Sequence, residues 1–584
     1  MPPRIAHPCR FSRVLLRALP LPRPAYRVAL PSTARFQHHD AAAAPLQYPR
    51  IRSSIIIPRS VTNTQPEDLI KHIGPVSKRR LNHERFIVLL LTPAFAHWLH
   101  DDHVFLEKAL RQAYQHAFAP SQRHPIRLHA LCAVVDKLPT PTSVGDDTSV
   151  DLSKRSRAFS PPVSETGYEG LAYTCLRNKQ DSIELPSSAV AEKGAISFVA
   201  IEGTEEKGFF TDTLQVPLAN TVFQTGSPTT MHFTSWQAVP QSNELKLTSK
   251  TQLSNHGIKL HRGGSTTRLS SALAVPLVPL TRPRQVHASM GNILRQVVGP
   301  DGKPMTASQE LEQVVPQYFK SRGDPQQATS VWALVIPNDV TQQVLEDTAH
   351  LLKNAQANHS HKEPADLPES SRWEKMWAST PPIWNTIVQS ALAKGARLHR
   401  VLSGGGGWGK KAGLLSLDPV ANSTDSEATA RFDSVHDPEE LSSALQQVAQ
   451  ENDFIQFFIS PSVLKPNGDN ADAQVAELQE LENINTPWHW ELGTVPSTVD
   501  SLEENTWQRQ PSDSKECFVF KHSFGALSEG ALSLRREFKL KLEDPVSAVS
   551  STKVDVPFSR FSFLLDKGLD EKEADKDVSG PEKD

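Results

Sequence analysis

Residues 86–91 read Phe-Ile-Val-Leu-Leu-Leu, and this run decides the fold class. Because its apolar residues are continuous rather than alternating, it predicts a strand that is covered on both faces. An amphipathic helix opened by Asp101-Asp102 is expected over 103–118, and a second strand over 126–136. A connection that contains a helix is long enough to join parallel strands. The segment therefore predicts an α/β unit with two parallel strands.

The rest of the chain continues this mixture of strands and helices. Strands are predicted at 170–176, 195–202, 208–216, 229–236, 244–252, 269–280, 331–336, 397–402, 454–459, 517–521, 537–542 and 558–565. Helices are predicted at 285–298, 308–320, 339–353, 383–394 and 437–450, and residues 475–481 fit either a loop or a short helix. The pattern predicts an α/β or α+β protein with mixed sheets.

Composition divides the chain into two predicted domains between disordered ends. Residues 354–372 hold Pro364 and Pro368 and few large apolar groups, which predicts a polar linker. The predicted plan is a transit peptide and disordered region over 1–60, a β-rich first domain over 61–353 with a mobile insertion at 139–166, the linker at 354–372, a second α/β domain over 373–565, and an acidic disordered tail over 566–584.

The N-terminus has the composition of a targeting signal. Residues 1–60 contain ten arginines, no lysine and one acid, Asp40. Arg-rich, acid-poor composition is typical of a mitochondrial transit peptide. The alternatives are a basic tail that binds nucleic acid and an N-terminus without a role, but the missing lysines and the apolar residues between the arginines favour import. We expect cleavage between Arg35 and Ser60, and a location in the mitochondrial matrix.

Charge, hydropathy and cysteine content exclude several classes of protein. The formal net charge is −3 although residues 1–60 are strongly positive, so the remainder is acidic and no nucleic-acid partner is expected. The longest apolar run, 86–96, is too short to span a membrane, which predicts a soluble protein. Neither a local zinc site nor a disulfide framework is expected, because the four cysteines are far apart. They are Cys9, Cys132, Cys175 and Cys517.

A glycine-rich segment is the first candidate site. Residues 403–411 read Ser-Gly-Gly-Gly-Gly-Trp-Gly-Lys-Lys and match the GxxxxGK pattern, in which backbone N–H groups and a lysine bind phosphate. Lys411 stands where that pattern needs Ser or Thr, which argues against a true Walker site. The alternatives are a looser anion-binding loop and a turn that packs Trp408. The candidate ligand-binding residues are Gly404, Gly405, Gly406, Gly407, Trp408, Gly409, Lys410 and Lys411.

Two further clusters of polar residues are candidate sites. Arg282, Arg284 and Arg295 surround a predicted helix start, where they would form either an anion pocket or an exposed basic turn. The second cluster has spacing suited to a transition metal. Since its acids also suit a helix N-terminus, we predict no metal site. Its members are His97, His100, Asp101, Asp102 and His103.

One family resemblance is visible. The strand–helix–strand pattern of 86–136 and the following segment 167–173, Gly-Tyr-Glu-Gly-Leu-Ala-Tyr, resemble the opening of FIST-type domains, which are linked to sensing small ligands. The resemblance covers about residues 86–176 and implies an α/β fold that binds a small ligand. It carries no functional residue over to this chain.

The function predicted from sequence is therefore general. No GxSxG or HExxH motif orders the serines and histidines into a catalytic set. This favours a non-catalytic protein that binds a small ligand or assembles with mitochondrial protein partners. The alternative is an enzyme, or a protein that binds a nucleotide or phosphometabolite, with Gly404–Lys411 as a cradle for the small anionic ligand. No cofactor is assigned.

Overall fold

The protein is an α+β protein with mixed sheets. Its structure is a computed structural model. It describes residues 52–100, 103–119, 122, 124–141, 166–177, 182–183, 194–204, 208–240, 242–260, 267–357, 368–380, 382–383, 385–404, 413–419, 448–461, 471–483, 489–497, 506–509, 514–541 and 548–567. Four predicted segments lie wholly or mostly outside these residues: the insertion at 139–166, the loop residues 405–411, the helix at 437–450 and the tail at 566–584. The described residues from 52 onward fall in one compact unit.

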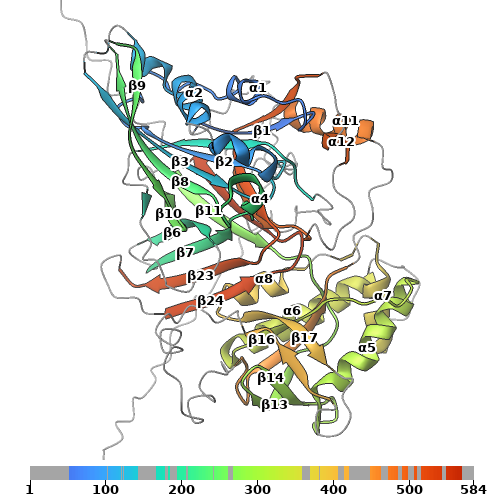
Figure 1. Cartoon of the computed structure of the whole chain (residues 1–584). Coiled ribbons are helices and arrows are strands. Elements are labelled where there is room, and N and C mark those ends of the chain that lie inside the picture. The colour runs from blue at the N-terminus through green and yellow to red at the C-terminus, as the bar shows by residue number, and fades with distance from the viewer. Residues whose placement is uncertain are drawn as a thin grey trace, which may run out of the picture. The chain divides into compact units, whose positions relative to one another are not determined.

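A seven-stranded sheet is built around the apolar run at residues 86–91 (Figure 1). Its order is β21 (Cys517–Lys521), β1 (Arg52–Pro58), β4 (Leu171–Leu176), β2 (Phe86–Leu91), β3 (Ile126–Val134), β8 (Met231–Val239) and β9 (Glu244–Gln252). β2 and β3 are parallel, with Phe86 opposite His129, which confirms the prediction. The connection between them contains η1 (Pro93–Leu99), α2 (Val104–Ala113) and η2 (Gln115–Phe118).

Every residue of strand β2 is apolar because the strand is covered on both faces. Ile87 and Leu89 face a core that includes α1 (Pro66–Ile70) and α2, whereas Val88 and Leu90 face a second core shared with other sheets. All six side chains of β2 are buried. A strand buried on one face alone would alternate apolar and polar residues. The helix after β2 begins at Val104 rather than at the acids.

Two more sheets use strands from the middle and the end of the chain. The six-stranded sheet has the order β24 (Ala548–Val554), β23 (Leu532–Lys539), β7 (Gly208–Pro217), β6 (Ala195–Thr204), β10 (Asn255–Leu260) and β5 (Ser182–Ile183). The four-stranded sheet has the order β11 (Thr267–Ala274), β25 (Arg560–Lys567), β20 (His489–Thr494) and β22 (Ser523–Ser528). The one-turn helices α4 (Val222–Thr225) and α12 (Thr506–Arg509) and the longer helix α11 (Ala471–Asn483) lie in the connections.

The fourth sheet has eight strands and packs on helices. Its order is β12 (Val278–Pro279), β19 (Phe454–Ile459), β13 (Arg284–Met290), β14 (Ile293–Val298), β18 (Leu415–Leu417), β17 (Arg397–Gly404) and β16 (Val331–Ile336), with β15 (Pro304–Thr306) beside β14. Its core is shared with α5 (Ala307–Arg322), α6 (Asn338–Ala357), α7 (Glu369–Ala378) and α8 (Ile387–Leu392). Figure 1 shows these helices beside β16 and β17.

Every sheet joins strands from both sides of the segment 354–372, which the sequence marked as a linker. β1 pairs with β21, β7 with β23, β11 with β25, and β16 with both β17 and β19. The part of that segment that the structure describes is helical, since α6 extends to Ala357 and α7 begins at Glu369. The two predicted domains therefore share all four described sheets.

The end of the predicted transit peptide falls inside the folded unit. β1 lies between β21 and β4, with Ile56 opposite Val519 on one side and Leu171 on the other. Ile55, Ile56 and Ile57 are at most 1% exposed. The boundary at residue 60 is therefore too late, because the segment 52–58 is a core strand rather than a disposable leader. Any removable leader ends before Arg52.

One predicted helix is a hairpin. Residues 285–298 form β13 and β14, which pair antiparallel, with Met290 opposite Ile293 across a two-residue turn. Gly291 has φ 57° in that turn, a conformation that glycine adopts without strain. The helix predicted at 308–320 is confirmed as α5, and it ends at Gly323 with φ 72°.

Candidate functional site

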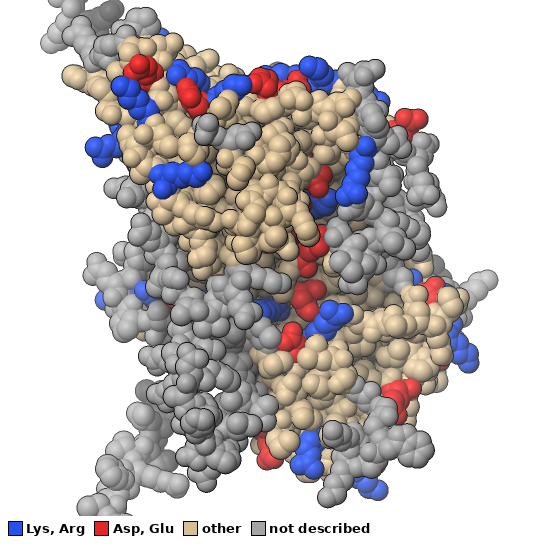
Figure 2. All heavy atoms as spheres, viewed as in Figure 1, with Lys and Arg blue, Asp and Glu red and all other residues tan. Residues whose placement is uncertain are grey.

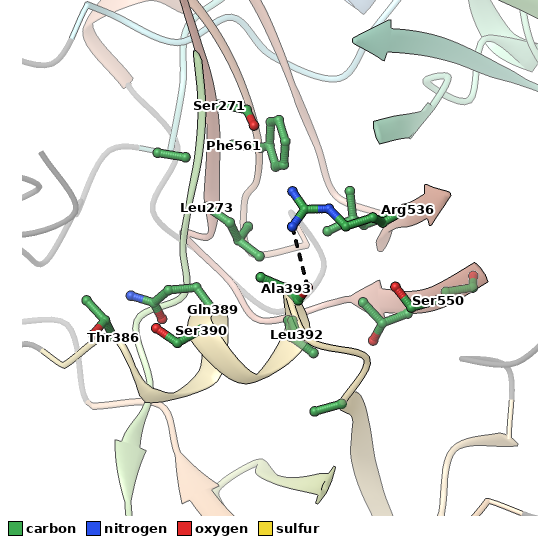
Figure 3. A pocket seen from close by; sticks show the side chains of 15 residues that line it. Ser271, Leu273, Thr386, Gln389, Ser390, Leu392, Ala393, Arg536, Ser550 and Phe561 are labelled. Atoms are coloured by element: carbon green, nitrogen blue, oxygen red, sulfur yellow. Dashed lines mark hydrogen bonds between the residues drawn. The ribbon is translucent and has the colours of Figure 1, made fainter. Parts of the chain in front are cut away.

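A cavity of about 540 Å³ lies where two of the sheets and one helix meet. Its walls come from β11 and β25 of the four-stranded sheet, β23 and β24 of the six-stranded sheet, and α8, which precedes β17 of the eight-stranded sheet (Figure 3). The lining residues are Ser271, Ala272, Leu273, Thr386, Gln389, Ser390, Leu392, Ala393, Ala396, Leu534, Arg536, Ser550, Ser551, Thr552 and Phe561. Its volume lies within the usual range for small-molecule sites, roughly 300–1,000 Å³.

Strand alternation brings the polar groups of β23 and β24 to this cavity. Leu534 and Arg536 are two residues apart and therefore face the same side of β23. Across the antiparallel ladder Thr552 is opposite Leu534, and Ser550 is opposite Arg536. The Thr552 hydroxyl also accepts a hydrogen bond from the Leu398 backbone N–H at 3.1 Å, which ties β24 to β17. The wall is thus built by register and is anchored to the neighbouring sheet.

Helix α8 presents its polar side chains to the cavity because its apolar ones are in the core. Ile387 and Val388 are buried with the core of the eight-stranded sheet. Asn385 precedes the helix, accepts a hydrogen bond from the Ile387 N–H at 3.3 Å, and donates one to the Leu277 carbonyl at 2.9 Å. This contact fixes the start of α8 and so positions Gln389.

Arg536 is the one charged side chain among the lining residues, and an acid neutralises it. Its Nε and Nη2 donate to the two carboxylate oxygens of Asp212 on β7, each at 2.6 Å. The Asp212 side chain is 1% exposed and that of Arg536 is 27% exposed. The Arg536 Nη1 donates to the Ala393 carbonyl at 3.5 Å, the contact drawn in Figure 3. The guanidinium is therefore fixed by Asp212 of the neighbouring strand β7 and by the Ala393 carbonyl next to α8.

Gln389 lines the cavity and holds a buried amide oxygen. Its amide Nε2 donates to the Asn385 carbonyl at 3.1 Å, which fixes the orientation of the amide. Its Oε1 is buried and has no hydrogen-bond partner among the described residues. A buried acceptor without a partner costs about 1–3 kcal/mol.

The glycine-rich segment lies between two antiparallel strands. Gly404 is the last residue of β17 and is opposite Leu415 of β18, so the segment joins the strands of a hairpin. Gly405, Gly406, Gly407, Trp408, Gly409, Lys410 and Lys411 lie outside the described residues. The described residues that follow, from Gly413 to Leu417, lead into a strand rather than a helix. Binding by this segment stays a prediction.

The three arginines of the predicted anion pocket have different surroundings. Arg284 on β13 donates to Glu310 of α5 at 2.8 and 3.0 Å, with both side chains largely buried. Arg282 forms an ion pair with Glu369 at 2.5 Å. Arg295 is exposed on β14. Two of the three positive charges thus face carboxylates, and an anion would have to compete with them.

The His/Asp cluster is spread along the surface. His97 and His100 are exposed at the end of η1, and His103 has φ 63° at the start of α2. Asp101 and Asp102 lie outside the described residues. The described part of the chain contains no group of three metal-ligating side chains.

Other buried charges lie away from the cavity. Glu491 pairs with Arg560 at 2.9 Å, and both side chains are at most 2% exposed. Burial raises the pKa of Asp136 to about 6, although it accepts hydrogen bonds from Ser528 and from the Glu529 N–H. Burial lowers the pKa of His399 to about 4. These groups join strands to one another and reach no described cavity.

Positive and negative side chains are mixed on the face of the molecule that Figure 2 shows. Figure 2 shows lysines and arginines interspersed with acids over the described residues of one face. Nucleic-acid-binding surfaces gather positive charge on one face or along one helix. The face in Figure 2 therefore lacks that arrangement. No helix in the part of the chain that the structure describes has both the length and the apolar character needed to cross a membrane.

Sequence reasoning missed the residues of the cavity. A signal for Arg536 does exist. It shares one face of β23 with Leu532, Leu534 and Phe538, which are spaced two residues apart, so the arginine stands on an otherwise apolar face. Asp212 interrupts a similar alternation on β7. Opposite charges on the inner faces of two strands predict a pair across a ladder. No such signal marks Gln389.

Comparison with known proteins gives no match. No family model, no curated protein and no solved structure matches this chain. The similarity to FIST-type domains therefore stays a prediction.

Proposed function

We propose that this protein binds a small molecule in the cavity between α8 and strands β11, β23, β24 and β25, and performs no chemistry on it. The observation that carries the proposal is the set of residues lining the cavity. Seven of the fifteen lining residues carry a hydroxyl or amide group, and none of the fifteen is an acid, histidine, cysteine, lysine or tyrosine. These are the side chains that most enzymes use for proton transfer.

The hydroxyl groups by themselves do not make a nucleophile. A serine or threonine attacks a substrate when a neighbouring base activates it. The charged group nearest to Ser550 along the ladder is Arg536, which is held by Asp212 and cannot accept a proton. Binding without reaction is the function that this chemistry supports.

We also propose that the protein works in the mitochondrion, on the evidence of its arginine-rich N-terminus. A reporter fused to residues 1–51, which precede β1, should enter mitochondria. The matched control carries the same segment with Arg13, Arg17 and Arg23 changed to Glu. A cytosolic reporter with the natural segment would refute this part of the proposal.

A thermal-shift screen with the full chain tests binding. We expect at least one metabolite to raise the melting temperature, and we expect Ser390→Phe, which fills the cavity, to abolish the shift. Ser249→Phe makes the same substitution at an exposed position of β9 and should leave the shift unchanged. Circular dichroism of each variant shows whether the fold is intact. A shift that persists in Ser390→Phe would place the site elsewhere.

A further inference from the structure

Six positively charged residues from three separate segments gather at one end of the seven-stranded sheet. They stand at the start of β1, just after the end of β4, and in the segment that leads into β2. We name this group the basic patch, and its members are Arg52, Lys78, Arg79, Arg80, Arg85 and Arg177. It shares no residue with the cavity, so it is independent of the proposed function.

Strand pairing brings the three segments together on one face of the sheet. Arg52 is opposite Cys175 on β4, and Arg177 follows Cys175 by two residues, so the three side chains lie on the same face. Arg85 comes directly before β2, and the ladder between β2 and β4 brings it to the level of Arg177. Cys175 is buried in the same core as residues of α1 and α2, so this is the face on which both helices pack (Figure 1).

One acid lies within the basic patch, and it is largely buried. Glu84 accepts a hydrogen bond from Arg80 at 2.9 Å, and its side chain is 11% exposed. Burial raises the pKa of its carboxyl, and the positive charges of Arg52, Arg80 and Arg177 oppose that rise. The three guanidinium groups therefore lie near one carboxylate, which can neutralise only one of them.

The basic patch thus carries an excess of positive charge at the surface. Glu84 is the only acid in residues 71–85. Lys78, Arg79 and Arg177 are exposed, and none of the three forms an ion pair with a described residue. Like charges held this close repel one another, so a partner that brings negative charge is attracted to them.

The chemistry of the basic patch favours the carboxylates of a short protein segment. Five of the six residues are arginines, whose planar guanidinium groups bind carboxylates at two points. Single-stranded nucleic acids stack their bases on aromatic rings, and peripheral proteins insert apolar side chains into membranes. None of the exposed large apolar side chains among the described residues belongs to the patch. Since the chain outside residues 1–60 is acidic, a long polyanion that extends beyond the patch would also be repelled.

We infer that the basic patch is an interaction surface for another protein, and that it binds a segment of that protein in which several Asp or Glu residues stand close together. The exposed cations Lys78, Arg79 and Arg177 meet the carboxylates of the segment. Attraction between such charges increases the rate of association and weakens as the salt concentration rises.

Fluorescence anisotropy of a labelled octaglutamate peptide tests this surface on the full chain. We expect octaglutamate to bind, octaglutamine not to bind, and added salt to weaken the complex. Changing Lys78→Gln, Arg79→Gln and Arg177→Gln together removes three exposed charges and should weaken binding about tenfold. Circular dichroism and the melting temperature without peptide check that the triple variant is folded.

A matched control removes three positive charges elsewhere. Arg295→Gln, Lys303→Gln and Lys320→Gln change exposed residues near the eight-stranded sheet, and this triple variant should bind octaglutamate as the natural chain does. Equal weakening of the two triple variants would overturn the inference, because binding would then follow net charge alone.

The arginine-rich N-terminus needs its own control, because it also attracts acids. A chain with Arg13→Gln, Arg17→Gln and Arg23→Gln should retain binding that depends on the basic patch. If this chain loses binding while the patch variant keeps it, the N-terminal segment is the site and the inference is wrong.

Other polyanions test the class of partner. The probes are a twelve-base-pair DNA duplex and vesicles of phosphatidylcholine with one fifth phosphatidylglycerol. We expect both to bind more weakly than octaglutamate. Tighter binding of either probe that is lost in the patch variant would refute an acidic protein segment as the partner. Failure of octaglutamate to bind would refute the inference and leave the proposed cavity ligand unaffected.

Discussion

The ion pair between Asp212 and Arg536 gives the most direct test of the structure. Changing Arg536 to Ala leaves the Asp212 carboxylate 1% exposed and without its two hydrogen bonds of 2.6 Å. Removing one partner of a buried pair costs about 3–5 kcal/mol. Because Arg536 is 27% exposed, water can reach part of the vacated space. We therefore expect a loss near the lower end, about 3 kcal/mol of unfolding free energy.

The neighbouring arginine is a matched control. Arg535 is the next residue on β23 and faces the other side of the strand, where it contacts Glu537 at 2.8 Å. Their side chains are 40% and 23% exposed. An ion pair at that exposure contributes less than about 1 kcal/mol. Arg535→Ala should therefore cost much less than Arg536→Ala.

Urea unfolding followed by tryptophan fluorescence measures both variants. The double change Asp212→Leu with Arg536→Met should recover most of the loss, since apolar residues of similar volume can replace a buried pair with little cost. Equal losses for Arg535→Ala and Arg536→Ala would refute the reasoning, because the structure gives the two arginines opposite faces of β23. So would a double variant as unstable as Arg536→Ala.

Three further predictions concern titration and the N-terminus. Burial raises the pKa of Asp136 to about 6, so the fold favours its protonated form, and its contribution to stability is lost as pH rises from about 4 to about 6. Urea unfolding at both ends of that range should show that Asp136→Asn gains up to about 3 kcal/mol of unfolding free energy relative to the natural chain. Burial lowers the pKa of His399 to about 4, so its contribution to folding stability is present above pH 6.5 and is lost as pH falls toward 4. His399→Gln should lessen this acid sensitivity by up to about 3 kcal/mol of unfolding free energy, and an unchanged pH profile would contradict the burial of His399. A chain lacking residues 1–47 should unfold cooperatively, whereas one lacking residues 1–58 should not; circular dichroism melts of the two decide whether β1 is part of the core.

Much of the strand content was predictable because the strands carry strong local signals. The continuous apolar run of β2 predicted a strand covered on both faces, and the long connection to β3 predicted a parallel pair. Sequence reasoning placed 285–298 in a helix although Gly291 and Asn292 separate two apolar segments there. A Gly-Asn pair between such segments is a hairpin signal, and β13 and β14 are that hairpin.

β1 was missed for a different reason. Its apolar core, Ile55 to Ile57, is short and stands between Arg52 and Arg59, so composition grouped it with the arginine-rich leader. Three consecutive β-branched residues are nonetheless a strand signal. Local composition and local pattern disagreed at this point, and the structure agrees with the pattern.

The cavity was beyond sequence reasoning because it depends on contacts between distant segments. Its lining residues run from Ser271 to Phe561 and come from four strands and a helix. Single serines and threonines in such segments have no spacing that marks them as a group. Only the pairing of β11 with β25 and of β23 with β24 brings them together.

The pairing of early strands with late ones affects how the chain is made. β11 ends at Ala274, and its only partner among the described strands, β25, begins at Arg560. A ribosome adding about 5–20 residues per second needs roughly 15–60 s to cover that interval. During this time β11 is unpaired, and β1 and β7 each lack a neighbour. Unpaired strand edges associate with other chains, so we expect a newly made chain to be prone to aggregation until its last strands are complete.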